Sequence, residues 1–228
     1  MKIITDEKVI KRNTRFGFWA SMASPVIMVF SAMMILNQPD LMVPALIVFL
    51  IGAAAFAIGM AFRKYSRGTE LELNQVLKKL NNKYSIYHFH TPVSHLLVGP
   101  AGIWMLHPKH VQGRVTYNER RKRWRLKQID PLSRILFFLV EGLGNPQREI
   151  MDEARALDRY LKKKWSLEEK PQVQAVMVMM NEKAEVQADN AHIPTVHISQ
   201  LREFLRKQEQ QNKMPASVIK EFKRTLEQ

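Results

Sequence analysis

Two long apolar segments near the start of the chain limit its fold more than any other feature. Residues 17–36 and residues 41–62 contain no charged side chain. A helix rises about 1.5 Å per residue, and roughly 20 apolar residues cross the hydrocarbon core of a bilayer, so each segment is long enough to span it. The polar residues 37–40 between them are typical of a tight turn. We therefore expect a transmembrane helical hairpin inside an N-terminal membrane anchor of residues 1–67, with the lipid bilayer as its partner.

Positive charge is unevenly distributed around these segments, and the only charge between them is that of Asp40. The flanking cations are Lys2, Lys8, Lys11, Arg12 and Arg15 before the first segment, and Arg63, Lys64 and Arg67 after the second. Cytoplasmic flanks carry an excess of Lys and Arg, so this pattern predicts that both termini are cytoplasmic. We expect a multi-pass protein of the cell inner membrane. The alternative is a soluble protein that buries both helices.

The remaining sequence is basic and contains no cysteine. The whole chain has 35 Lys and Arg residues against 21 Asp and Glu residues, a formal net charge of +14. Such an excess favours contact with nucleic acid or anionic lipid but does not choose between them. The absence of cysteine excludes structural disulfides, Cys-based zinc sites and cysteine nucleophiles.

Helical and strand-like patterns mix after residue 67. Apolar residues recur at helical spacing in 68–83 and after Asn145, where Asn145 can cap a helix and Pro146 suits its first position. Strand-like runs occupy 83–90, 94–99, 103–106, 113–117, 123–127, 173–180 and 195–198, and another helix follows from residue 199. This order predicts an α/β domain of residues 68–208 with a central mixed sheet. We expect a surface helix in residues 209–228, and a helix or re-entrant segment, too short to span, in 131–144.

Several pieces of this domain form a recognisable set. HLLVGPAGIWML at 95–106 is followed by Lys109 and Gly113, and later by Asn145-Pro146. With this order of elements, residues 68–204 resemble the nuclease-related domain (NERD) family of the restriction-endonuclease-like superfamily. The resemblance implies a restriction-endonuclease-like α/β fold behind the membrane anchor.

The resemblance also implies where a nuclease site would lie, and there the sequence departs from the family. The family pattern has an Asp just before the first hairpin strand and an acid or Gln two residues before the Lys. Here those positions hold Ser94 and His107, while Lys109 and Glu70 remain. Mg²⁺ prefers hard oxygen ligands, which a hydroxyl and an imidazole replace poorly. We expect a vestigial catalytic site, no cofactor and no catalysis.

Two other interpretations of the same region stay open. A relocated carboxylate, Glu149 or Glu70, could hold Mg²⁺ or Mn²⁺ and keep the protein an active nuclease; otherwise both are charges at helix starts that complement the helix dipole. Five of the seven histidines lie in 88–110. A zinc site there is conceivable, but no established ligand spacing supports it, and polar surface or interface groups are the alternative.

A basic turn provides the candidate binding surface. Its residues are Arg120, Arg121, Lys122, Arg123, Trp124 and Arg125. The cations could neutralise DNA or RNA phosphates while Trp124 stacks on bases. Contact with anionic lipid, or a plainly solvated hairpin tip, explains the same residues. The sequence therefore favours a nucleic-acid-binding or scaffold module, with an active nuclease or a partner of another membrane protein as alternatives.

Overall fold

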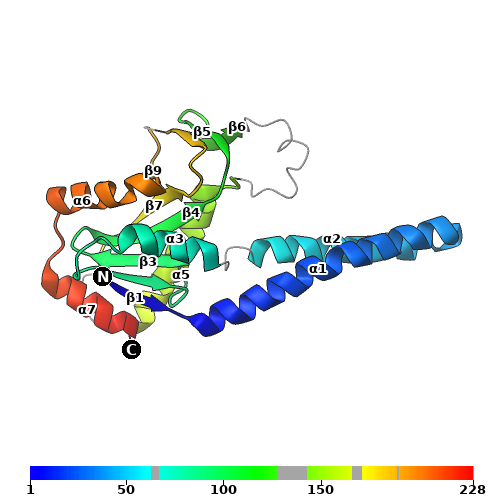
Figure 1. Ribbon diagram of the computed structural model, residues 1–228, viewed down its shortest axis with the longest axis horizontal. Coiled ribbons are helices and arrows are strands. Elements are labelled where there is room, and N and C mark those ends of the chain that lie inside the picture. Colours follow the sequence, from blue (N-terminus) through cyan, green and yellow to red (C-terminus); the bar gives the residue numbers. More distant parts are fainter. Residues whose placement is uncertain (63–66, 128–142, 166–170, 189, 228) are drawn as a thin grey trace. The chain divides into compact units, whose positions relative to one another are not determined.

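The computed structural model describes residues 1–62, 67–127, 143–165, 171–188 and 190–227 (Figure 1). The chain forms two compact units. One is Asp6–Glu70, and the other combines Met1–Thr5 with Leu71–Gln228. The apolar segment expected at 131–144 lies, except for its last two residues, outside the described residues.

The first unit contains the two long apolar helices predicted from the sequence. They are α1 (Glu7–Asn37) and α2 (Met42–Ala61), joined through the short 3₁₀ helix η1 (Pro39–Leu41). Helix α1 begins ten residues before its apolar run because Asp6 caps it, accepting hydrogen bonds from the backbone N–H groups of Lys8 and Val9 at 3.1 Å each. Both helices are long and apolar enough to cross a membrane.

The two helices pack along a seam of small residues. The buried positions of α1 are Ile10, Gly17, Ser24 and Ser31, and those of α2 include Ala45, Gly52 and Gly59. Both sets recur every seven residues, which is two helical turns, so each forms one stripe. The Ser31 hydroxyl donates to the Ala45 carbonyl at 2.6 Å. A Cβ atom at Gly59 would lie only 2.9 Å from the backbone nitrogen of Ser21, so the seam requires glycine there.

The second unit is built on a six-stranded mixed sheet in the order β1-β2-β3-β4-β7-β9. The strands are β1 (Lys2–Thr5), β2 (Ser85–His88), β3 (His95–Gly99), β4 (Gly102–Lys109), β7 (Val173–Met179) and β9 (Thr195–His197). Strand β1 pairs in parallel with β2, placing Lys2 opposite Ser85. Residues 1–5 therefore belong to the α/β unit and not to the expected anchor of 1–67, a boundary that a four-residue strand beside a helix does not reveal in sequence.

A second, smaller sheet was also not anticipated. Its three strands are β5 (Gly113–Asn118), β6 (Arg123–Lys127) and β8 (Ala184–Gln187), in the order β6-β5-β8. The hairpin β5–β6 itself was predicted. Val115, Tyr117, Trp124 and Leu126 share one face of it, as their register pairs show.

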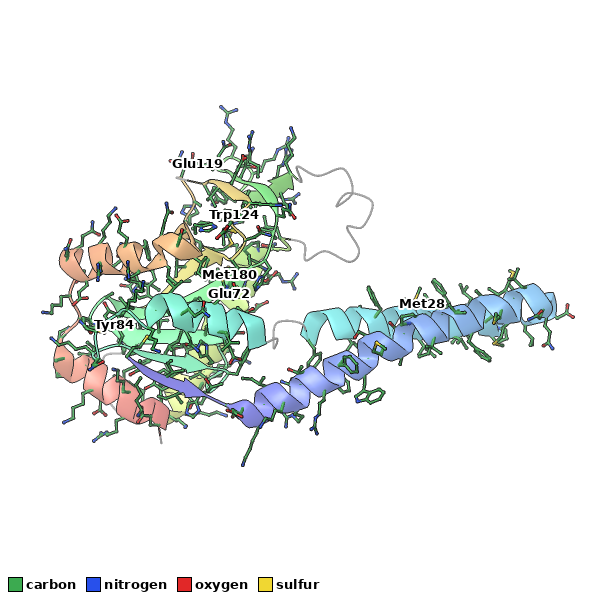
Figure 2. All side chains as sticks on the ribbon, in the orientation of Figure 1. Met28, Glu72, Tyr84, Glu119, Trp124 and Met180 are labelled. Carbon is green, nitrogen blue, oxygen red and sulfur yellow. The ribbon has the colours of Figure 1, made fainter. Side chains whose placement is uncertain are left out.

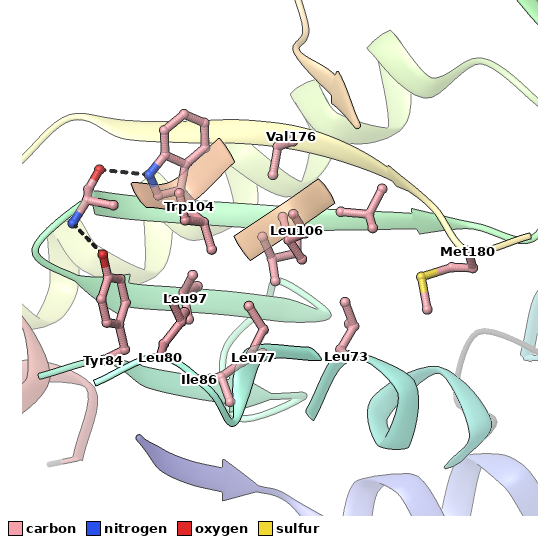
Figure 3. Packing of buried hydrophobic residues seen from close by; sticks show 14 residues of the cluster. Leu73, Leu77, Leu80, Tyr84, Ile86, Leu97, Trp104, Leu106, Val176 and Met180 are labelled. Atoms are coloured by element: carbon pink, nitrogen blue, oxygen red, sulfur yellow. Dashed lines mark hydrogen bonds between the residues drawn. The ribbon is translucent and has the colours of Figure 1, made fainter. Parts of the chain in front are cut away.

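Helices cover both faces of the central sheet. Helices α3 (Arg67–Leu77) and α6 (Leu201–Gln211) pack on one face through Leu73, Leu77, Leu201 and Leu205 (Figure 3). Helices α5 (Pro146–Lys164) and α7 (Ala216–Glu227) pack on the other. Helix α7 is more than the expected surface helix, because Ile219, Phe222 and Leu226 are buried.

The Gly-Pro-Ala-Gly turn between β3 and β4 is held by aromatic side chains. A Cβ atom on Gly99 would fall 2.1 Å from the Tyr84 ring, so only glycine admits the ring there. The Tyr84 hydroxyl accepts from the Ala101 N–H at 3.2 Å and donates to Glu209 at 2.8 Å. Trp104 Nε1 donates to the Ala101 carbonyl at 2.9 Å (Figure 3). These bonds fix the start of β4, whose far end carries His107 and Lys109.

Candidate functional site

The candidate site forms where strand alternation and helical spacing meet. Successive side chains of a strand point to opposite faces, so His107 and Lys109 share the face of Ile103 and Met105, which pack with α5 and α7. Helix α5 begins at Pro146, and Asn145 caps it by accepting from the Arg148 N–H at 3.2 Å. This start was predicted. It places Glu149 in the first turn, and Glu153 lies one turn further on the same face.

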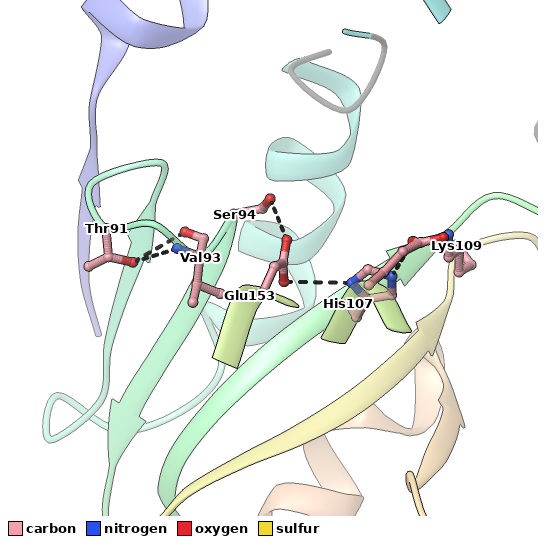
Figure 4. A network of polar contacts seen from close by, with 7 residues as sticks. Thr91, Val93, Ser94, His107, Lys109 and Glu153 are labelled. Atoms are coloured by element: carbon pink, nitrogen blue, oxygen red, sulfur yellow. Dashed lines mark hydrogen bonds and ion pairs between the residues drawn. The ribbon is translucent and has the colours of Figure 1, made fainter. Parts of the chain in front are cut away.

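Five side chains, Ser94, His107, Lys109, Glu149 and Glu153, form a connected polar network (Figure 4). The Lys109 ammonium and His107 Nε2 both contact Glu149 Oε2, at 2.8 and 3.0 Å. His107 Nδ1 lies 3.7 Å from Glu153 Oε2, and the Ser94 hydroxyl donates to Glu153 Oε1 at 3.2 Å. The imidazole therefore stands between two carboxylates. We refer to these residues as the α5–β4 network.

The network is internally charge-balanced. Burial alone lowers the pKa of His107, but hydrogen bonds to Glu149 and Glu153 outweigh it, so the pKa is raised and the imidazolium is favoured. The hydrogen bond from His107, with a further one from Lys109, lowers the pKa of Glu149 to about 2. The side chains of His107 and Lys109 are 11% and 8% exposed. Two buried cations thus face two carboxylates.

A second group of histidines lies on the opposite face of the sheet. His88 Nδ1 and His95 Nδ1 are 2.8 Å apart, and His88 Nε2 is 3.0 Å from Asn74 Oδ1 of α3. Burial lowers the pKa of His88 to about 4 and that of His95 well below its usual value. When both imidazoles are neutral, His95 Nδ1 can donate to His88 Nδ1, and His88 Nε2 then donates to Asn74 Oδ1. These histidines are satisfied core groups.

The β5–β6 hairpin presents a row of cations to solvent. Its exposed residues Arg120, Arg121, Lys122, Arg123, Arg125 and Lys127, termed here the basic face, form no ion pair with any described residue. Figure 2 shows nitrogen-tipped side chains projecting around Glu119, with Trp124 nearer the central sheet. Trp124 alternates away from Arg123 and Arg125, and its ring centroid is 5.0 Å from that of Tyr117. Trp124 therefore lies on the opposite face of the hairpin from Arg123 and Arg125, although the sequence predicted that it would act together with them.

The sequence profile of the nuclease-related domain (NERD) matches residues 66–180, just over half of the 228 residues. The chain belongs to the nuclease-related domain family. The matched region runs from α3 to the end of β7 and includes the α5–β4 network and the basic face. No curated protein and no solved structure matches the chain significantly.

The NERD domain brings together most of the residues singled out from its sequence. Ser94, His107 and Lys109 lie in one network, and Glu149, considered as a relocated acid, contacts two of its members. Glu153 was missed, although its spacing of four residues from Glu149 was a usable signal. Glu70 is 7% exposed in the first turn of α3 and falls in the Asp6–Glu70 unit, so its role at the site stays a prediction.

The NERD domain does not gather its histidines into a zinc-type site. Within the described ranges, no group of three or more His, Asp and Glu side chains is arranged to hold a metal ion. His88 and His95 point to the α3 face, whereas His107 points to the α5 face, because they differ in strand parity. The sheet itself therefore divides the histidine-rich segment into two separate environments.

Proposed function

We propose that this protein is a membrane-tethered, catalytically inactive NERD domain that binds nucleic acid through its basic face. One observation carries the inactive part of the proposal: both carboxylates near Lys109 already bind cationic side chains of the α5–β4 network. In a metal-dependent nuclease such carboxylates hold a divalent ion against the phosphate. Here His107 stands between them.

The donor set supports this reading on chemical grounds. Mg²⁺ binds oxygen ligands at about 2.0–2.1 Å in octahedral geometry. The two positions expected to supply oxygens hold a hydroxyl, Ser94, and an imidazole, His107. Glu149 contacts Lys109 at 2.8 Å through the same oxygen that contacts His107. These residues do not fit a resident Mg²⁺ ion.

The basic face supports nucleic-acid binding. Its six cations are exposed and lack carboxylate partners among the described residues, so they are available to phosphates. Cations that displace the counterions of a nucleic acid supply affinity without sequence specificity. Since Trp124 packs inward, base stacking on it is not part of the proposal, and a duplex or single strand is held by its backbone.

The hairpin supports membrane tethering. Its seam is lined by small and polar side chains, while large apolar residues face outward, the reverse of a soluble helix pair. Phe18, Trp19, Val26, Phe30, Leu46, Ile47 and Leu50 are each more than half exposed. Lipid can cover this surface without leaving the buried Ser31 hydroxyl unpaired, because that hydroxyl donates to the Ala45 carbonyl.

The pairing of β1 with β2 supports an even number of spans. These strands flank the hairpin in sequence yet lie side by side in one sheet, so both ends of the hairpin must be on the same side of the membrane. The cations that flank both apolar segments make that side the cytoplasm. The protein is then a multi-pass protein of the inner membrane with both termini cytoplasmic.

A cleavage and binding assay tests the function. Purified full-length protein in lipid nanodiscs is incubated with supercoiled plasmid and Mg²⁺ or Mn²⁺, and binding to labelled DNA and RNA is titrated with salt. We expect salt-dependent binding without cleavage. Arg123→Gln/Arg125→Gln should reduce the slope of log affinity against log salt by about 2, whereas the charge-matched control Lys162→Gln/Lys163→Gln on α5 leaves it unchanged. If the protein binds neither DNA nor RNA at low salt, binding to another membrane protein replaces nucleic-acid binding as the proposed function.

The second candidate is an active nuclease with a relocated acid. The contact between Lys109 and Glu149 favours it, because an acid beside this lysine is what the resemblance to active members requires. The same plasmid assay decides between the two. Metal-dependent nicking that disappears in both Lys109→Ala and Glu149→Gln establishes the nuclease and overturns the inactive domain.

Membrane topology is tested with single cysteines, since the chain has none of its own. Gln38→Cys probes the exposed end of α1, and Ser217→Cys probes the exposed start of α7. In intact spheroplasts, a membrane-impermeant maleimide should label the first variant and spare the second until the membrane is lysed. Equal labelling of both before lysis contradicts the proposed hairpin.

A further inference from the structure

A groove open to solvent, about 770 Å³ in volume and termed here the cavity, is lined by residues of α7, of β1 and of the start of β2. Four cations, Lys2, Lys220, Lys223 and Arg224, and two carboxylates, Glu221 and Glu227, line it. All belong to the α/β unit, and none takes part in the α5–β4 network or the basic face. The cavity therefore carries a net charge of +2.

Three of the cations come from successive turns of one helix. Lys223 and Arg224 follow Lys220 by three and four residues, so all three project along one side of α7. Lys2 approaches from the opposite wall, because β1 is parallel to β2 with Lys2 opposite Ser85. Ser85, 2% exposed, and Ser217 add hydroxyl groups to the lining. Cationic side chains therefore line the cavity on two sides, from α7 and from β1.

The carboxylates do not neutralise these cations completely. Glu227 contacts Lys2 at 2.8 Å, and Glu221 contacts Arg224 at 2.7 Å. Among the described residues Lys220 forms no ion pair, whereas Lys223 donates to the Lys83 carbonyl at 2.7 Å and shares the electrostatic attraction of Glu227 with Lys2. Burial lowers the pKa of Lys223, the nearby Glu227 offsets this in part, and Lys2 lowers the pKa further.

We propose that this cavity is a binding site for a phosphate monoester, either a small phosphorylated molecule or the headgroup of an acidic lipid. A phosphate monoester carries a charge of about −1.5 to −2 near neutral pH, which is close in size and opposite in sign to the net charge of the residues that line the cavity. Lys220 and Lys223 supply the charge-assisted hydrogen bonds, and Lys2 and Arg224 already hold carboxylates at the rim.

Isothermal calorimetry on the full-length protein in uncharged detergent tests the site. The soluble probe is glycerol 3-phosphate, with sodium chloride of equal ionic strength as the blank. We expect saturable binding that weakens about tenfold or more in Lys220→Gln, because a charge-assisted hydrogen bond is lost. Lys162→Gln, an exposed helical lysine on α5, is the matched control and should bind as the wild type does.

A second arm separates the two sources of the phosphate group. Nanodiscs containing phosphatidic acid are compared with nanodiscs containing phosphatidylglycerol, whose phosphate is a diester with a single charge. If the ligand is a headgroup, phosphatidic acid abolishes glycerol 3-phosphate binding and phosphatidylglycerol does not; if it is a soluble compound, neither lipid competes. No saturable binding in the wild type, or equal binding by Lys220→Gln, Lys223→Gln and the wild type, overturns the proposal.

Discussion

At the scale of single residues, His107 decides how the candidate site behaves. Its imidazole contacts Glu149 and Glu153 through opposite ring nitrogens, and Lys109 contacts the same oxygen of Glu149. The protonation of His107 is therefore coupled to that of Glu149, and the pKa of His95, lowered mainly by burial, is lowered further by the charge of His107. The sequence shows that this position departs from the family pattern. The two carboxylates that contact the imidazole lie on α5, about forty residues further along the chain, so the sequence alone did not reveal the contact.

The network should make stability depend on pH in a way that His107 controls. Because its folded-state pKa is raised above the usual 6.5, His107 contributes stability that is complete below pH 6.5 and is lost as pH rises through the folded-state pKa. Denaturation of wild type and His107→Gln should therefore differ most near pH 5.5 and least near pH 9. A difference that grows with pH contradicts an imidazolium at this position.

The proposed exclusion of a metal ion by His107 can be tested by substitution. Ser94→Asp/His107→Asp restores two carboxylates and removes the competing imidazole, so it should gain binding of Mn²⁺. Bound at a hundredfold excess over its Kd, the ion adds about 2.7 kcal/mol to the free energy of unfolding. The wild type and the isosteric Ser94→Asn/His107→Asn variant should show no such thermal shift, and a shift in the wild type would show that the native network accepts the metal.

At the scale of secondary-structure elements, long periodic segments were predictable, whereas the short strands β1 and β8 were not. Helices α1, α2 and α5 follow from apolar length or from the Asn145-Pro146 start, and β3, β4 and β7 follow from apolar runs. Strands β1 and β8 are four residues each, with no apolar alternation strong enough to mark them, and they exist because neighbours offer an open edge. Tertiary pairing, which sequence periodicity does not encode, decided those elements.

The seam between α1 and α2 should be sensitive to a single methyl group. In Gly59→Ala the new Cβ atom meets the backbone of Ser21 at 2.9 Å, and backbone cannot move aside as a side chain can. We expect a loss of about 1–3 kcal/mol, seen as a lower melting temperature of the detergent-solubilised protein. Ala54→Leu adds more volume on an exposed side of α2 and should leave the melting temperature nearly unchanged. Equal effects would argue against the observed seam.

At the scale of the whole molecule, the α/β unit is assembled from two separate parts of the chain. Met1–Thr5 supplies an edge strand and everything else follows the hairpin. The sequence predicted an anchor, a NERD-like domain and a C-terminal helix in succession. It did not predict that residues 1–5 join the sheet from before the two apolar helices, because β1 becomes recognisable only through its pairing with β2.

Truncation tests this arrangement. A fragment of residues 71–228 lacks β1 and leaves β2 as an unpaired edge, so it should be less stable and more prone to aggregate than a fragment in which Met1–Thr5 is joined to Leu71 by a flexible linker. Urea denaturation followed by circular dichroism compares the two. If both unfold at the same urea concentration, β1 contributes nothing to the sheet.

The position of β1 also sets an order of events during synthesis. The strand is synthesised before the two apolar helices and its partner β2 after them, since Lys2 pairs with Ser85. The two strands that border the hairpin in sequence are neighbours in space, so this edge of the sheet cannot be completed until both helices have been synthesised.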